Sequence, residues 1–139
     1  MKKILAIIPL FAFSILIGCS QTNQQPTQVT TPAADFIKFE TLSHDFGKIP
    51  QNGNGTFEFI FNNTGKENLV LKNVGTSCGC TVPEWPKEPI APGAKGTIKV
   101  KYNTANIGSF TKTITVYSNG SVNPIVLRIN GIVEVPGAK

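Results

Sequence analysis

Two of the three cysteines stand close together in the segment TSCGCT, residues 76–81. Thiols at this spacing can form a local disulfide, lie as paired buried thiols, bind a soft metal ion, or exchange disulfides catalytically. In an extended strand the Cα atoms of residues two apart lie roughly 6.6 Å apart, near the upper limit of about 6.8 Å for a disulfide. Gly79 between Cys78 and Cys80 lets the backbone contract. We therefore favour a local disulfide or structural turn, and rank paired thiols, a metal contact and a redox pair below it.

The residues that a metal site or an active site would also need are scarce. His44 is the only histidine, and a closed zinc site needs four ligands. We predict no cofactor and no metal site, with Cys78 and Cys80 as the only candidates for a metal contact. The dipeptide His44-Asp45 resembles half of a hydrolase triad, but neighbouring residues of a strand point to opposite faces and no serine completes the geometry. The sequence therefore predicts no enzyme.

The N-terminus indicates the compartment in which the cysteine pair operates. Two lysines precede an uncharged apolar run, residues 4–17, as in a secretory signal. This run is shorter than the roughly 20 residues that span a bilayer. Residues 16–19, LIGC, resemble the lipobox of bacterial lipoproteins, in which the cysteine carries acyl chains such as palmitate. We predict a lipoprotein signal peptide over residues 1–18 and lipidation of Cys19.

Lipidation of Cys19 would attach the chain to membrane lipid and leave Cys78 and Cys80 as an even pair. An exported chain meets conditions that permit disulfides. Loss of the two N-terminal lysines with the signal lowers the net charge from +5 to +3, and the remaining lysines are spread along the chain. We expect no nucleic-acid binding. We expect a lipid-anchored location in the cell envelope, and Ser20 favours the periplasmic side of the outer membrane.

The elements that position the cysteine pair follow a polar segment. Residues 20–34 are rich in Gln, Thr, Asn and Pro and show no apolar period, so they cannot bury enough surface to order the backbone. We predict a lipid-anchored flexible tether over residues 19–35, one domain over residues 36–135 and a C-terminal tail over residues 136–139.

Within the predicted domain, apolar and polar residues alternate with the period of two that is typical of strands. Turn signals with Asn, Gly and Pro separate the runs, and no segment shows helical spacing. We predict an all-β, immunoglobulin-like β-sandwich of about seven strands, with an open barrel as the alternative. The expected strands are residues 37–41, 46–49, 56–61, 69–74, 97–102, 110–116 and 125–130.

The segment after the cysteines repeats proline at every third residue, at Pro83, Pro86, Pro89 and Pro92. This period matches the three residues per turn of a polyproline II helix. Such a run can bind an aromatic groove, which makes Trp85, Pro86 and Pro89 candidates for a partner surface. We favour a stiff crossover between two strands, with Trp85 and Ile90 packed against the domain.

Four segments are together similar to domain of unknown function family 1573: HDFGKI at 44–49, FIFNNTG at 59–65, TSCGCT at 76–81 and IAPG at 90–93. The similarity extends over roughly residues 40–133. The resemblance implies an immunoglobulin-like fold of the type found in cilia and centrosome proteins, in a secreted or lipid-anchored bacterial chain. It implies no established activity.

These features predict a non-catalytic, lipid-anchored immunoglobulin-like module of the bacterial cell envelope that binds or scaffolds an unknown partner. The expected partner, besides membrane lipid, is an envelope protein or polysaccharide. The alternative is a thiol redox or copper-handling protein that uses Cys78 and Cys80. Thiol counting and metal analysis of the purified protein distinguish these two hypotheses.

Overall fold

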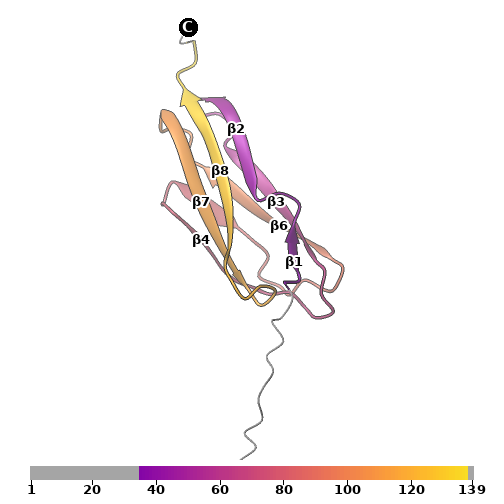
Figure 1. Cartoon of the computed structure of the whole chain (residues 1–139). Coiled ribbons are helices and arrows are strands. Elements are labelled where there is room, and N and C mark those ends of the chain that lie inside the picture. The colour runs from indigo at the N-terminus through magenta and orange to yellow at the C-terminus, as the bar shows by residue number, and fades with distance from the viewer. Residues whose placement is uncertain (1–34, 138–139) are drawn as a thin grey trace, which may run out of the picture.

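A computed structural model describes residues 35–137 of the chain. The predicted signal peptide, Cys19 and nearly all of the predicted tether lie outside the described residues. Within residues 35–137 the chain forms eight strands and no helix, hence no helix that could span a membrane (Figure 1). The strands are β1 (Ile37–Phe39), β2 (Ser43–Pro50), β3 (Thr56–Asn63), β4 (Leu71–Thr76), β5 (Thr81–Glu84), β6 (Lys95–Tyr102), β7 (Gly108–Ser118) and β8 (Ile125–Glu134).

The strands form two four-stranded sheets, in the orders β1-β3-β6-β5 and β2-β8-β7-β4. Among the described strands every paired neighbour runs antiparallel except β2 and β8, which run parallel. The prediction of an all-β sandwich is confirmed.

The core lies between the two sheets and is built from the apolar positions of the alternating pattern. Phe59 and Phe61 of β3 are fully buried, whereas Glu58, which precedes Phe59 in the strand, is exposed. Ile114 of β7 and Leu127 of β8 fill the facing side. Full burial of a side chain of this size contributes about 1.5–3 kcal/mol, so the pattern that the sequence shows also stabilises the sandwich.

The strand that sequence reasoning missed is β5, which contains Pro83 at the edge of its sheet. In the antiparallel register Thr81 pairs with Tyr102, and Asn103 N donates to Cys80 O at 2.8 Å. Hydrogen-bonded and non-hydrogen-bonded pairs alternate along such a ladder, so the nitrogen of Pro83 falls on the side away from β6. Proline at that position removes no ladder bond. The expected seven strands therefore become eight.

The chain enters the sandwich at one end, where Phe36 N donates to Gly120 O at 2.8 Å. We call this the entry end; it includes the turn between β7 and β8. At the opposite end, Thr104 Oγ1 donates to Gly53 O at 2.7 Å and joins the loops of residues 51–55 and 103–107. Figure 1 shows β8 extending from the entry end to this distal end.

Asn63 forms a buried group of three side-chain hydrogen bonds near the entry end, which we call the Asn63 knot. Its Nδ2 donates to Glu67 O at 2.7 Å and to Ile90 O at 2.8 Å, and its Oδ1 accepts from Gly65 N at 2.9 Å. The side chain is fully buried. Because every hydrogen-bonding atom of its amide group is used, burial of this polar group carries no unsatisfied donor or acceptor. The knot joins the end of β3 to the connection between β5 and β6.

Candidate functional site

The cysteine loop, residues 77–80, joins β4 of one sheet to β5 of the other. Cys78 and Cys80 form a disulfide bond, and their Cα atoms lie 5.3 Å apart. The backbone is thus contracted relative to an extended strand, as a bond at this spacing requires. Gly79 is exposed, and a Cβ atom added there would meet nothing within 4 Å. Both sulfur-bearing residues are half-buried.

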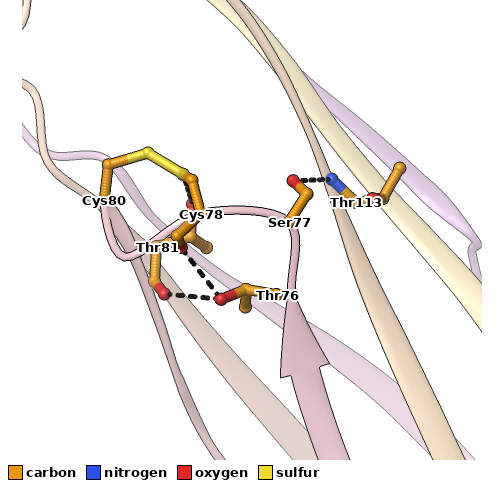
Figure 2. The surroundings of a disulfide bond; sticks show 6 residues. All are labelled: Thr76, Ser77, Cys78, Cys80, Thr81 and Thr113. Atoms are coloured by element: carbon orange, nitrogen blue, oxygen red, sulfur yellow. Dashed lines mark hydrogen bonds between the residues drawn. A yellow bond between two sulfur atoms is a disulfide. The ribbon is translucent and has the colours of Figure 1, made fainter.

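Hydrogen bonds hold both ends of this loop, and Figure 2 shows those formed by Thr76 and Ser77. On the β4 side, Ser77 N donates to Thr113 O at 3.0 Å, and Thr113 N donates to Ser77 Oγ at 3.2 Å. On the β5 side, Asn103 N donates to Cys80 O at 2.8 Å. The hydroxyl of Thr76 lies 3.0 Å from Cys78 O, across the loop. The two sheets therefore hold the loop independently of the disulfide.

The two sulfur atoms have different surroundings. Cys78 Sγ lies 3.9 Å from the hydroxyl of Thr81, whose side chain is only 2% exposed. Cys80 instead lines an open hollow of about 370 Å³, together with Gly79, Val82, Lys101 and Asn103. Val82 is 57% exposed. Cys80 also packs against the core, and it is the cysteine of the pair that a molecule in the hollow would contact.

A second hollow of about 400 Å³ adjoins the first at the distal end. The two share Lys101 and Asn103, and residues 52–56 form most of the remaining wall. Of the described residues that line the second hollow, only Lys101 carries a charge. The distal end thus presents hydrogen-bonding groups and one ammonium group beside the disulfide.

The metal contact that the sequence analysis ranked below a disulfide has no supporting cluster in the described part of the chain. Residues 35–137 contain no group of three or more His, Cys, Asp or Glu side chains that could hold a metal ion. The two sulfurs are bonded to each other, and a disulfide lacks the thiolates that Cu(I) or zinc would need.

His44 and Asp45 occupy separate structural roles on β2. The His44 ring stacks on Phe57 with centroids 3.6 Å apart and meets Phe46 edge-on at 4.5 Å. Burial lowers the pKa of His44, and the negative charge of Asp45 opposes this effect. Asp45 Oδ1 accepts from Gly47 N at 2.8 Å, at the bulge of β2. The aromatic ring packs, and the carboxylate supports the turn of the backbone.

The candidate partner surface in the proline-rich segment is only partly exposed. Trp85 is half-buried against the core, and Lys87 Nζ lies 3.0 Å from its ring centroid. Its Nε1 is buried without a hydrogen-bond partner among the described residues. Pro86 is half-buried and Pro89 is exposed. A partner contact through these residues stays a prediction.

Sequence reasoning missed the residues that surround Cys80. The alternation of residues 97–102 places Lys101 on the outer face of its strand, but it does not show which strand lies beside it. Lys101 pairs with Val82 across β5 and β6. Because β5 lies in a proline-rich segment without an alternating pattern, this pairing had no sequence signal.

The same fold occurs in solved structures at low sequence identity. The ASH/PapD-like domain of human CEP192 (PapD-like domain 7) has a TM-score of 0.65 and 7% identity, over 79% of this chain and 92% of that one. A protein of unknown function from Porphyromonas gingivalis W83 has a TM-score of 0.62 and 15% identity, over 73% of this chain. The match covers 49% of that chain, so the present chain spans about half its length.

A third similar structure, the Vibrio cholerae VesB protease, has a TM-score of 0.56 and 13% identity, over 70% of this chain and 32% of that one. At these identities the likenesses establish the fold alone, because one fold carries many functions. None of the curated proteins matches the chain in sequence. The sequence profile of DUF1573, described as a protein of unknown function, matches residues 37–133, and the chain therefore belongs to the DUF1573 family.

Proposed function

We propose that the protein is a lipid-anchored, non-catalytic binding module of the bacterial cell envelope, and that its distal end holds a protein partner. The hydrogen bond from Phe36 N to Gly120 O carries this proposal, because it holds Phe36, the residue that follows the predicted tether, at the entry end of the sandwich. A tether from acylated Cys19 would therefore attach at that end. The two hollows that meet at Lys101 lie at the other.

The chemistry of the distal end suits a protein surface. Val82 and Ile107 are 57% and 58% exposed and offer apolar contacts. Lys101 supplies a charge, and Asn103 supplies an amide. Apolar contacts flanked by hydrogen-bonding groups are the usual composition of a protein interface. The cysteine loop, fixed by both sheets, would give this interface a rigid border.

Site-specific photo-crosslinking in intact envelopes tests the distal end. A photoreactive residue at Ile107 is expected to give a discrete adduct with another envelope protein. The matched control is Val122, which is 72% exposed and lies at the entry end. An adduct from position 122 without one from position 107 would contradict the proposed face.

The lipid anchor is tested separately by Cys19→Ser. Metabolic labelling with a fatty-acid analogue should mark the wild-type chain and leave the variant unlabelled and released from the membrane fraction. An unlabelled wild-type chain in the soluble fraction would reject the anchor but not the distal binding face.

A further inference from the structure

We propose that the Cys78–Cys80 disulfide is a reversible thiol–disulfide exchange site for a dithiol, and that the incoming thiolate attacks Cys80. This activity goes beyond the proposed binding function and does not depend on a partner at the distal end. Three features of the site carry it: the different surroundings of the two cysteines, the positive charge in the hollow that Cys80 lines, and the hydrogen bonds that hold the loop without the disulfide.

The asymmetry concerns access. Exchange requires a thiolate to approach one sulfur while the other leaves, so its rate depends on which sulfur can be reached. Cys80 lines the open hollow, whereas Cys78 Sγ lies beside the nearly buried hydroxyl of Thr81. Figure 2 shows the sulfur–sulfur bond on the side of the loop that lies away from Thr113. Access therefore favours attack at Cys80.

Charge and hydrogen bonding favour the same direction. Lys101 is exposed in the wall of the hollow, and none of the described lining residues carries a negative charge. The two salt bridges of the described residues join Lys48 to Glu134 and Lys95 to Glu40, so the Lys101 ammonium group is not neutralised by either. The positive charge of this group attracts the incoming thiolate to the hollow that Cys80 lines. On the other side, the Thr81 hydroxyl is placed to donate to the thiolate that leaves at Cys78.

The loop keeps its support when the sulfur–sulfur bond opens. Ser77 remains bonded to Thr113 in one sheet, and Cys80 O still accepts from Asn103 N in the other. The disulfide encloses one intervening residue, and a ring this small restricts the unfolded chain little. Reduction is therefore compatible with a folded domain, as a reversible site requires.

The reaction is balanced by the dithiol. Its first thiolate bonds to Cys80 Sγ, the Cys78–Cys80 bond breaks, and Cys78 leaves as a thiolate that takes up a proton. The second thiolate of the dithiol then attacks the mixed disulfide and releases Cys80, which is protonated in turn. The dithiol is oxidised to a disulfide, and the cysteine pair is reduced to two thiols.

The test uses the full chain in detergent, with dithiothreitol as the dithiol and glutathione to trap the first step. We expect dithiothreitol to reduce the pair while the thermal unfolding transition stays cooperative. Glutathione, quenched by acid and mapped by mass spectrometry, should form its adduct on Cys80 in about tenfold preference to Cys78. An oxidised TSCGCT peptide, which lacks the hollow, serves as the reference for selectivity. Equal adducts on both cysteines of the protein would overturn the proposal.

The role of Lys101 has a matched control on the same strand. Lys101→Gln should slow glutathione attack about 3- to 10-fold at low ionic strength, because the charge that attracts the thiolate is lost. Lys99→Gln also removes an exposed lysine from β6, but Lys99 pairs with Glu84 and does not line the hollow. Its rate should stay within about twofold of wild type. Equal slowing in both variants would overturn the assignment of Lys101.

Discussion

The Asn63 knot and the cysteine loop each link separate positions of the backbone, but they differ in how far apart those positions are in the sequence. Asn63 is fully buried and reaches Ile90 O, 27 positions along the chain, through a hydrogen bond. The disulfide is covalent, yet it joins cysteines only two positions apart in a half-exposed loop. Stabilisation depends on the separation that a link closes and on the burial of the groups it satisfies. We therefore expect the hydrogen bonds of Asn63 to contribute more to the free energy of unfolding than the covalent disulfide does.

The largest effect is expected for Asn63→Ala. The substitution removes three hydrogen bonds: Ile90 O still accepts from Leu69 N at 2.9 Å, whereas the half-buried Glu67 O and Gly65 N lose their side-chain partner. A group left unsatisfied in this way costs about 1–3 kcal/mol. We expect the free energy of unfolding to fall by about 3–5 kcal/mol, measured by chemical denaturation. Asn62→Ala, at the neighbouring position of β3, is the control and should change it by less than about 1 kcal/mol. A similar loss in both variants would show that the knot is not the cause.

The double substitution Cys78→Ser, Cys80→Ser should have a smaller effect. The chain-entropy relation for such a short loop gives about 1.5 kcal/mol as the stabilisation that is lost. The hydrogen bonds of Ser77 and Asn103 keep the loop in place, so the domain should remain folded. If the double variant lost more stability than Asn63→Ala, the disulfide and not the Asn63 knot would make the larger contribution to the free energy of unfolding.

The sequence predicted the parts of the fold that repeat a pattern. Alternation in residues 56–61 and 125–130 was sufficient to place Phe59 and Leu127 in the core, because burial of one strand face imposes a period of two. It was not sufficient for β5, because Pro83 lies in an edge strand with its nitrogen on the side away from β6, and no local pattern marks such a position. Nor did it reveal the Asn63 knot, since a buried asparagine and an exposed one look alike until the distant carbonyl groups are known.

The candidate site was likewise predictable from the sequence only in part. The TSCGCT segment and the flexible Gly79 made a disulfide feasible from the sequence alone. The hollow beside Cys80 needs Lys101 and Asn103, which follow the pair by about twenty residues and reach it only through the β5–β6 pairing. Long-range pairing between strands is a property of the assembled sheet and has no signal in a short window of sequence.

Thr76→Val tests the non-covalent part of the cysteine loop. The hydroxyl of Thr76 lies 3.0 Å from Cys78 O and 3.2 Å from Thr81 O, and it has one hydrogen to donate. Valine keeps the shape of the side chain and removes that donor, at an expected cost of about 1 kcal/mol. Thr111→Val, an exposed threonine on β7, is the control and should lie within about 0.5 kcal/mol of wild type. Equal denaturation curves for the two variants would show that the loop does not rely on this hydroxyl.

The smallest expected effect concerns His44, which is part of neither the Asn63 knot nor the cysteine loop. Its ring stacks on Phe57. Burial lowers its pKa in the folded state below the usual 6.5, against the opposing charge of Asp45. As the pH falls through 6.5, the unfolded chain therefore binds a proton that the folded chain does not, and the free energy of unfolding decreases. This decrease ends below the folded-state pKa, where both states are protonated. His44→Phe keeps an aromatic ring at this position and removes the titration, so its stability should depend less on pH between 5.5 and 7.5 than that of the wild type. Chemical denaturation at a series of pH values measures both curves. If they run parallel, the protonation of His44 is not linked to folding, and the ring serves packing alone.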